Sequence, residues 1–591
     1  MKSLWLALAL LVSGLLSACS AEEAQETDRQ SPPNILFILL DDLGYNDLGF
    51  NSDAGVHTPN LDAFAEEGIH FTRHYVDSTC SATRAGFLTG RPPVASGFRP
   101  SGLGVSPETE TLPEILQSLG YSTHHIGKWH LGYASRLAWP TAQGYDSFYG
   151  FLNQFLLRGP HPEGRLRIDR PTYRNPWLQE DDGHPSQQEG HLSDLLLKRA
   201  LDFIDQAAAR REPWFLNYWT YLPHTPLQPA SRFAQQFPAT PEGRYRAMLA
   251  QLDDAIGQIL AALERDGLDK STLVVIASDN GGTNKQINNN APFTGVKASF
   301  TEGGLRTPLM MRWPDSLGAG SSRDEVVSYL DYLPTIVAAA GGKAPADLPG
   351  RDLGLLLDGH ELDTRELYWE AGDSEVNAWG VLSQDGRWRL QRYYHWEPQL
   401  YDLHADPAGS RDVSVESPEV VEAMASRFLT WRKQQRRVAL EYKSLGENGR
   451  AQLTGDPLQR APGFGGFTFA IGVSPGEGSG TEKQVIAAQP GYWRLSQEGD
   501  SLQLTMNGVD LKAPAPVAGK CSSVIVTSMF AHRNTDPDSS DAIVELYIDG
   551  ELMARVDQPR PSLPPDHYLR PTYIGQGAGR NPHPRLARSL F

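Results

Sequence analysis

The sequence has few cysteines, few basic residues and almost no long apolar runs, and each shortage excludes a class of protein. Only 3 of its 591 residues are cysteines, which excludes a disulfide-rich scaffold. Lys and Arg total 53 against 71 Asp and Glu, so the formal net charge is -18 at pH 7. We therefore expect no nucleic-acid partner, and an anionic ligand would need a local cluster of cations. With 40% hydrophobic and 21% charged residues, the chain is expected to fold, into two to four domains at roughly 150 residues each.

One long apolar run is present, at residues 4–16 after Lys2. It is too short to cross about 30 Å of hydrocarbon as a helix, so we interpret it as a secretion signal. The run ends in Leu-Ser-Ala-Cys19, which resembles the bacterial lipobox. This resemblance implies that residues 1–19 form a lipoprotein signal peptide, that Cys19 is lipidated and, from Ser20, that the lipid anchors the protein at the outer membrane. The alternative is an ordinary signal peptide, which would leave the protein periplasmic or secreted.

The pattern of apolar residues predicts an α/β fold for residues 33–355, after a polar tether at 20–32. Two uninterrupted apolar runs, 34–40 and 272–278, indicate strands buried on both faces of a parallel sheet. Helical patterns occupy residues 60–67, 112–119, 191–209 and 243–266. Strands that alternate with helices predict an α/β sandwich, whose ligands bind beyond the carboxyl ends of the strands.

The remaining chain predicts two smaller units. Residues 356–440 contain short strand patterns and then an amphipathic helix at 416–437, which predicts a small α+β subdomain. Glycine and proline are frequent in 441–466, which we interpret as a linker. Residues 467–591 alternate in polarity around Asn507-Gly508 and Asp549-Gly550, so we expect an all-β sandwich domain with hairpins at these turns.

Both apolar runs end in oxygen-bearing side chains: Asp41 and Asp42 follow the first, and Asp279 and Asn280 follow the second. Such hard ligands favour Ca²⁺ or Mg²⁺ over zinc. A single pair is more often an Asx turn or a helix cap. Two pairs at the ends of buried strands favour a metal site.

Several motifs carry a resemblance to a known family. Cys80-Ser-Ala-Thr-Arg84, followed by Leu-Thr-Gly90, matches the signature of the type I sulfatases. Further matches in family order are Gly-Lys128-Trp-His130-Leu-Gly, Pro-His224-Thr-Pro, Gly-Val-Lys297 and the run 302–308. The resemblance covers about residues 33–435. It implies an alkaline-phosphatase-like sulfatase sandwich with a small C-terminal subdomain.

The family resemblance also implies a role for each matched residue. A maturation enzyme would oxidise Cys80 to formylglycine, whose hydrated aldehyde is the nucleophile. Asp41, Asp42, Asp279, Asn280 and an oxygen of the modified Cys80 would bind one Ca²⁺. Arg84 would support the diol, Lys128 would bind sulfate, and His130 would be the base that drives sulfate expulsion. His224 and Lys297 would contact the ester and help to protonate the departing alcohol.

Elementary chemistry agrees with these roles. Anionic oxygens shield the sulfur of a sulfate monoester, so a site must neutralise charge and offer a strong nucleophile. A serine or an unmodified cysteine would leave a sulfated enzyme that needs water for its cleavage. A diol avoids this, because its second hydroxyl collapses to the aldehyde and expels sulfate.

Three functions remain open at this point. The leading hypothesis is a calcium-dependent sulfatase acting on a sulfated carbohydrate, which lipid anchoring and a C-terminal tail with a loose resemblance to laminin G or concanavalin A-like domains favour. The second is a phosphomonoesterase or phosphodiesterase of the same superfamily, and the third is a catalytically silent glycan-binding lipoprotein. Arg158, Arg165, Arg167, Arg170 and Arg174 form either a solvated loop or a basic rim for polymer substrates.

Overall fold

The computed structural model describes most of residues 32–435 and a set of strands between 450 and 575. The described ranges are 32–52, 55–96, 98, 104–105, 109–133, 136–159, 171–210, 212–283, 288–317, 320–357, 360–370, 378–393, 396–435, 450–452, 467–473, 484–489, 493–506, 509–515, 522–532, 540–548, 551–559 and 573–575. The predicted signal peptide, the tether up to residue 31, most of the arginine-rich stretch and both hairpin turns lie outside them. None of the described helices is long and apolar enough to cross a membrane.

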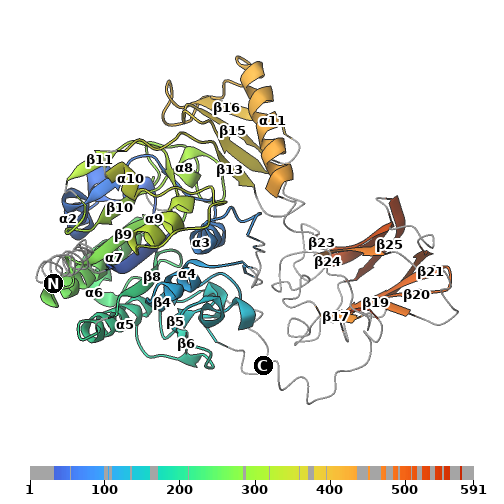
Figure 1. Cartoon of the computed structure of the whole chain (residues 1–591), viewed down its shortest axis with the longest axis horizontal. Coiled ribbons are helices and arrows are strands. Elements are labelled where there is room, and N and C mark those ends of the chain that lie inside the picture. The colour runs from blue at the N-terminus through green and yellow to red at the C-terminus, as the bar shows by residue number, and fades with distance from the viewer. Residues whose placement is uncertain are drawn as a thin grey trace, which may run out of the picture.

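A ten-stranded mixed sheet forms the centre of the larger unit (Figure 1). Its order is β11-β2-β10-β9-β1-β8-β4-β5-β6-β7. The strands are β1 (Asn34–Asp41), β2 (Ile69–Phe71), β4 (Ser122–Lys128), β5 (Ser147–Phe151), β6 (Trp177–Glu180), β7 (Ser186–Gln187), β8 (Trp214–Pro223), β9 (Thr272–Ser278), β10 (Leu309–Arg312) and β11 (Ser321–Arg323). β1 pairs in parallel with β8 and β9, as its continuous apolar run predicts. The sheet is not wholly parallel, because β10 pairs antiparallel with β9 and β6 with β5.

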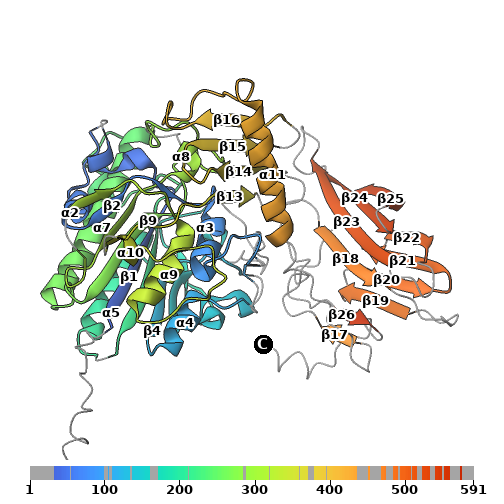
Figure 2. The same cartoon turned by 45° about the horizontal axis from the view of Figure 1, so that its top comes forward.

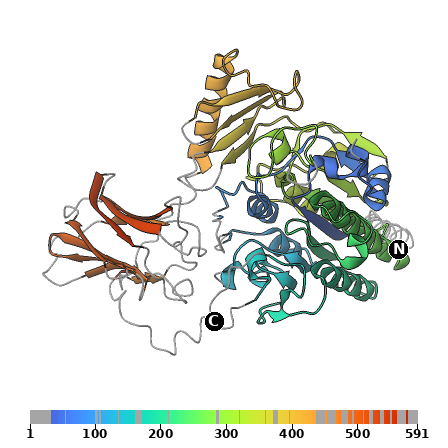
Figure 3. The same ribbon diagram turned by 180° about the vertical axis from the view of Figure 1, so that it is seen from behind.

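Both faces of this sheet are covered by helices, and β1 shows why. Alternate side chains point to opposite faces of a strand, so Ile35, Phe37 and Leu39 join one apolar core while the residues between them join the other. One core is closed by α3 (Cys80–Thr89), α4 (Leu112–Ser118) and α9 (Tyr332–Ala339). The other is closed by α2 (Pro59–Glu67), α5 (Leu192–Ala207) and α7 (Pro241–Arg265). Figures 1 and 3 show the two helical layers from opposite sides.

The pairing of β1 brings three chain segments to one edge of the sheet. Asp41 lies opposite Pro223 of β8, and Leu40 lies opposite Ser278 of β9. The residues that follow these strands therefore meet at their carboxyl ends, where ligands of α/β sheets bind.

A four-stranded antiparallel sheet forms the predicted subdomain and packs against the larger unit (Figure 2). Its strands, in spatial order, are β13 (Leu367–Glu370), β14 (Trp379–Leu382), β15 (Trp388–Arg392) and β16 (Gln399–Asp402). One face carries α11 (Pro418–Gln435), where Trp379 and Phe428 stack with ring centroids 4.5 Å apart. The other face packs Trp369 against Phe300 and Tyr75 of the larger unit. The sheet thus lies between a surface helix and the segment around α8 (Glu302–Leu305).

The described strands after residue 449 form two further antiparallel sheets, as the alternating pattern predicts. One has the order β17-β26-β19-β20-β21-β22 and the other β18-β23-β24-β25. Their bounds are β17 (Arg450–Gln452), β18 (Phe467–Val473), β19 (Gln484–Gln489), β20 (Trp493–Glu498), β21 (Ser501–Met506), β22 (Val509–Pro514), β23 (Ser522–His532), β24 (Ser540–Ile548), β25 (Glu551–Pro559) and β26 (Tyr573–Gly575). β17 lies inside the segment expected to be a linker and pairs with β26.

Short elements complete the described structure. The strands β3 (His74–Tyr75) and β12 (Val327–Ser328) pair in parallel beside the main sheet. The remaining helices are α6 (Ser231–Ala234) and α10 (Gly354–Leu357), with single turns of 3-10 helix at 45–47, 49–51, 136–138, 140–143, 154–156 and 329–331.

Candidate active site

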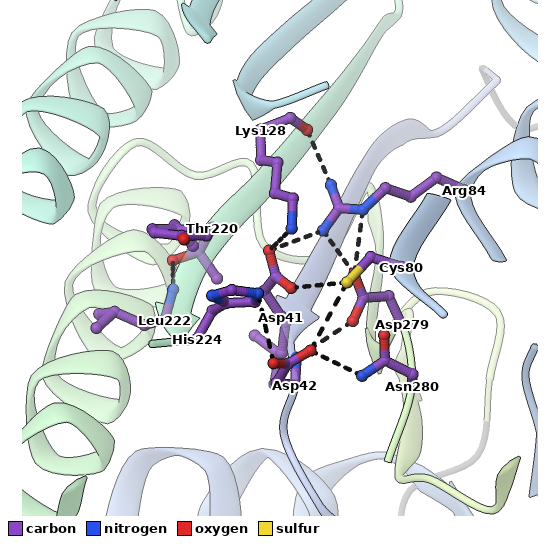
Figure 4. Close-up of polar contacts among 12 residues, drawn as sticks. Asp41, Asp42, Cys80, Arg84, Lys128, Thr220, Leu222, His224, Asp279 and Asn280 are labelled. Atoms are coloured by element: carbon purple, nitrogen blue, oxygen red, sulfur yellow. Dashed lines mark hydrogen bonds and ion pairs between the residues drawn. The ribbon is translucent and has the colours of Figure 1, made fainter. Parts of the chain in front are cut away.

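The ends of β1 and β9 place the four oxygen-bearing side chains together (Figure 4). The amide N of Asp42 donates to Oδ1 of Asp279 (3.2 Å), and Nδ2 of Asn280 donates to Oδ1 of Asp42 (2.8 Å). All four residues are buried. Asp42 has φ of 65°, a left-handed conformation that non-glycine residues seldom adopt and that turns the chain directly after the strand. The expected convergence of the two strand ends is therefore present.

Cys80 lies among these side chains as the first residue of α3. Its Sγ lies 3.3 Å from Oδ1 of Asp41 and 3.6 Å from Oδ1 of Asp42, and Nζ of Lys297 approaches it to 3.0 Å. The thiol is free and buried. Burial and the nearby carboxylates of Asp279 and Asp41 raise the pKa of the thiol well above its ordinary value. An unmodified Cys80 is thus held as a neutral thiol and is a poor nucleophile.

Arg84 is one turn further along α3 and joins the two acidic strand ends. Its Nε and one terminal nitrogen donate to Oδ2 of Asp279 (3.1 and 2.7 Å), and the same terminal nitrogen lies 3.4 Å from Oδ2 of Asp41. The other terminal nitrogen donates to the backbone O of Lys128 (2.9 Å), and the guanidinium lies 4.9 Å above the ring of Trp219. Such a guanidinium is fixed on every side and acts as a stationary positive charge.

Lys128 is the last residue of β4, and its ammonium points at the carboxylate of Asp41. Nζ of Lys128 donates to Oδ2 of Asp41 (2.6 Å), and both side chains are fully buried. The preceding Gly127 has φ of 119°, and a Cβ there would meet the backbone O of Trp219 at 1.9 Å. Only glycine allows this close approach of β4 to β8, which explains the glycine before the lysine in the motif.

His130 lies two residues beyond Lys128, again with a left-handed backbone (φ 63°). Its Nδ1 is buried and has no hydrogen-bond partner among the described residues. Burial lowers the pKa of His130 well below its ordinary value, and the charges of Lys128 and Arg84 lower it further. The imidazole is therefore neutral near pH 7 and able to accept a proton.

His224 and Lys297 approach the cluster from loops. Nε2 of His224 lies 3.5 Å from Oδ2 of Asp42, and the imidazole stacks on Tyr221 at 4.7 Å between ring centroids. Nζ of Lys297 donates to Oδ1 of Asp42 (2.5 Å). The side chain of His224 is 11% exposed and that of Lys297 is 21% exposed. A ligand that enters from solvent would reach these two side chains first.

The three carboxylates differ in their pKa values, because the nearby cations lower the pKa of two of them and do not prevent a raised pKa in the third. Burial alone would raise the pKa of Asp41, but Lys128, His224 and Arg84 together hold it well below its ordinary value. Burial likewise opposes ionisation of Asp42, yet His224 and Lys297 lower its pKa. For Asp279, burial and the charge of Asp41 outweigh Arg84 and raise its pKa to about 6. An additional cation would ease the repulsion between Asp279 and Asp41.

The chemistry of this cluster fits a hard divalent cation. Oδ1 of Asn280 is buried without a hydrogen-bond partner among the described residues, so it is free to act as a ligand. Ligand atoms of Asp41, Asp42, Cys80 and His224 lie within 4.8 Å of one another. Carboxylate and amide oxygens are the ligands that Ca²⁺ prefers, whereas an imidazole is a poor one. We therefore favour the oxygen set, including Asn280, over a set that contains His224.

The residues named from the sequence contact one another in this cluster, apart from His130, which lies near enough for Lys128 and Arg84 to lower its pKa. The sequence did not reveal the groups that support them. Trp219 lies under Arg84, and Tyr221 lies 5.3 Å from Nζ of Lys128 as well as against His224. The hydroxyl of Tyr173 donates to the backbone O of Tyr221 (2.7 Å) and of His224 (2.8 Å). Trp219 and Tyr221 belong to an apolar stretch in which each residue of β8 is buried, so no alternation marks them out.

Comparison with protein families and known proteins gives a consistent result. Residues 33–342 match the sulfatase family, and residues 297–434 match the family described as N-sulphoglucosamine sulphohydrolase, C-terminal. N-acetylgalactosamine-6-sulfatase of Rattus norvegicus is 33% identical over 387 residues, which cover 61% of this chain and 72% of the relative. Arylsulfatase A of Homo sapiens is 31% identical over 455 residues, covering 66% of this chain and 86% of the relative.

Among solved structures, that of Ps i-CgsB in complex with k-i-k-neocarrahexaose is similar to this chain. The two are 27% identical and superpose with a TM-score of 0.63, which covers 70% of this chain and 96% of the other.

Proposed function

The chain belongs to the sulfatase family, which the match over residues 33–342 establishes. On this premise we propose that it hydrolyses sulfate monoesters of a sulfated carbohydrate, with formylglycine at position 80 and one bound Ca²⁺. The observation that carries the proposal is the position of Cys80. Its sulfur lies within hydrogen-bonding reach of Asp41, Asp42 and Lys297 at the start of a buried helix. This sulfur stands where the oxygens of a modified side chain would be.

The charges of the cluster suit a sulfate monoester. Apart from histidine and position 80, the ionisable groups in contact here are three cations (Arg84, Lys128 and Lys297) and three carboxylates (Asp41, Asp42 and Asp279). They balance without a metal, so a divalent ion leaves a net charge of +2 in a buried site. A monoanionic ester would be held there by attraction, and its binding would lower the net charge from +2 to +1.

Two groups would be added to the chain. Formylglycine at position 80 would supply a hydrated aldehyde as a nucleophile toward sulfur that needs no water for its regeneration. Ca²⁺ would be held by Asp41, Asp42, Asp279 and Asn280, and it would supply positive charge at the site. A sulfatase-maturing enzyme is therefore a required partner of this protein.

The side chains of the protein then divide the work. Arg84, fixed on Asp279, holds position 80 and the carboxylates in place. Lys128 binds a sulfate oxygen, and neutral His130 accepts the proton whose loss drives sulfate release. Lys297 and His224 contact the ester from the exposed side, where they stabilise and protonate the departing alcohol. Removing one preorganised donor of this kind typically costs about 3 to 4 kcal/mol in the transition state.

The carbohydrate part of the proposal draws on the relatives. N-acetylgalactosamine-6-sulfatase takes its name from a sulfated sugar, and the structure of Ps i-CgsB holds a neocarrahexaose. We further propose that residues 467–591, which supply every described strand of the two C-terminal sheets except β17, form a laminin G or concanavalin A-like domain. We also propose that Cys19 carries a lipid that anchors the protein at the outer membrane.

Mass spectrometry and ester hydrolysis test the proposal together. A tryptic peptide that contains position 80 should lose the mass expected for conversion of a thiol to an aldehyde when the maturing enzyme is co-expressed. The matured protein should release sulfate from aryl sulfates, much faster than phosphate from the matching aryl phosphates. Faster phosphate release would point to a phosphoesterase. A Cys80 that stays a thiol under these conditions, with no turnover of either ester, would point to a silent glycan-binding protein.

The sugar can be identified by screening. The matured enzyme is incubated with a panel of sulfated oligosaccharides, and desulfation is followed by NMR. We expect desulfation of at least one sugar, and activity on aryl sulfates without desulfation of any sugar would contradict the carbohydrate part alone.

A further inference from the structure

The loop that carries Lys297 is bound at both ends by the four-stranded subdomain. At its start, the amide N of Thr294 donates to the backbone O of Ala408 (3.0 Å), and its Oγ1 donates to the backbone O of Gly409 (2.6 Å). At its end, the amide N of Phe300 donates to the hydroxyl oxygen of Tyr393 (2.6 Å). Lys297 lies between these two attachments.

The middle of the loop has a conformation that it would not adopt unaided. Ala298 has φ of 65°, which is unfavourable for a residue with a Cβ. Its amide N donates to the backbone O of Ser78, two residues before Cys80, at 2.7 Å. The amide N of Lys297 donates to the backbone O of Gly282 (3.1 Å). A strained bend persists only when its surroundings hold it, so the attachments at the two ends contribute to the position of Lys297.

Tyr393 is the most specific of these attachments because it is a side chain. It follows β15 directly, and its ring stacks on that of Phe300 with centroids 6.1 Å apart and planes 18° apart. Phe300 is buried, and a Cβ on Gly380 of β14 would meet the Cβ of Phe300 at 3.0 Å. The ring contact and the hydrogen bond together fix the residue that ends the loop.

We infer that Tyr393 is a positioning residue of this enzyme. Its hydroxyl holds the amide of Phe300, and through the loop it keeps the ammonium of Lys297 at 3.0 Å from the position-80 side chain and 2.5 Å from Asp42. The subdomain is thereby part of the catalytic apparatus although Tyr393 touches no reacting atom. The inference rests on the proposed function, in which Lys297 assists the departing alcohol.

A pair of tyrosine variants tests this inference. Tyr393→Phe keeps the ring stacked on Phe300 and removes only the acceptor oxygen. Tyr401→Phe is the matched control, because Tyr401 lies in β16 of the same sheet and its hydroxyl accepts from Nε2 of Gln391 (3.4 Å) instead of from an amide of the loop. We expect Tyr393→Phe to lower kcat for alkyl sulfates about tenfold with little change in KM. The loss should be smaller for aryl sulfates with good leaving groups, which need less help from Lys297. The control should behave as the wild type.

The same substitution in a Lys297→Ala background separates positioning from general damage. Tyr393→Phe should cost little further activity there, since the group that it positions is gone. Equal losses in both backgrounds, or wild-type kinetics of Tyr393→Phe with both ester types, would overturn the inference.

Hydrogen exchange supplies a readout that does not need turnover. Amides in residues 294–300 should exchange faster in Tyr393→Phe than in wild type or Tyr401→Phe, and unchanged exchange would also overturn the inference. A wild-type enzyme that carries formylglycine but releases no sulfate would instead refute the proposed function, while the exchange data would still decide whether Tyr393 holds the loop.

Discussion

The candidate site has an inner and an outer half that are built differently. The inner half consists of Arg84 and Lys128 with the carboxylates of Asp41 and Asp279, and the side chains in its ion pairs are fully buried. It comes from helix α3 and from strands and strand ends of the main sheet. The outer half, His224 and Lys297, lies on loops and is partly exposed. Asp42 contacts both of these outer residues.

This difference in burial predicts that the two halves contribute differently to stability and to activity. A fully buried ion pair contributes little net stability by itself, but removing one partner leaves an uncompensated charge and is costly. Loop residues that face solvent can be changed at lower cost to the fold. The inner half should therefore couple activity to stability, whereas the outer half should affect activity alone. The following substitutions test this contrast, from the largest expected effect to the smallest.

Position 80 contacts Asp41 of the inner half and Lys297 of the outer half, belongs to neither ion-paired group, and should show the largest effect on turnover. Cys80→Ala should lower sulfate release by roughly four orders of magnitude or more, because the nucleophile is lost. Its melting temperature and its affinity for calcium should stay close to those of the wild type, since the described residue makes no ion pair and four of the five ligands expected for Ca²⁺ remain. Ester hydrolysis, thermal unfolding and calorimetric titration with Ca²⁺ measure the three quantities. Wild-type turnover by Cys80→Ala would remove position 80 from the mechanism.

Arg84 tests the coupling between activity and stability. Arg84→Ala should destabilise the fold by about 3–5 kcal/mol, because Asp279 and Asp41 lose their buried partner. Activity should fall by roughly 10²–10³-fold as well. The control is Arg199→Ala, which removes a surface ion pair with Glu180 and should change neither quantity measurably. Denaturant titration measures the free energy of unfolding, and steady-state kinetics measures the activity. A stable but inactive Arg84→Ala would contradict the coupling between the two.

Lys297 tests the other side of the contrast. Lys297→Ala should lower activity by about 10²-fold with a nearly unchanged melting temperature, because its ammonium is partly exposed. Lys198→Ala, which breaks an exposed pair with Asp202, provides the control for loss of a lysine. A large drop in the melting temperature of Lys297→Ala alone would show that the outer half is structural too.

The inner half was also the part that the sequence predicted best. Each of its residues follows or belongs to a strong local signal: Asp41 and Asp279 follow continuous apolar runs, and Arg84 and Lys128 each lie in a family motif. Parallel strands that end at one edge then bring these signals together. Helix bounds agreed within a few residues, since α7 (Pro241–Arg265) was expected at 243–266.

What the sequence could not predict depends on contacts between distant segments. The antiparallel β10 and β6 make the sheet mixed, because neither short strand carries a signal of its direction. Trp219 under Arg84 and Tyr393 against Phe300 are aromatic residues with no periodicity that distinguishes them from the core. Such partners are defined by tertiary packing, which overrides local patterns.

A substitution at Asp47, in the turn that follows Asp42, should have the smallest overall effect of these substitutions. Asp47 is buried, and one of its carboxylate oxygens accepts from the amide N of Gly44 (2.8 Å) and from the hydroxyl of Tyr245 (2.6 Å). Burial outweighs these bonds and raises the pKa of Asp47 to about 8, from 3.8. Between these values the folded chain holds a proton that the unfolded chain has lost, so the contribution of Asp47 to stability falls as pH rises.

The variant Asp47→Asn cannot ionise, so it removes this loss of stability at higher pH. Its amide oxygen can still accept the hydrogen bonds from Gly44 and Tyr245. The melting temperature of the variant relative to wild type should therefore rise between pH 5 and pH 8, by roughly a few degrees at most. A difference that is constant or falls with pH would mean that Asp47 is ionised in the folded protein and that the turn behind Asp42 tolerates its charge.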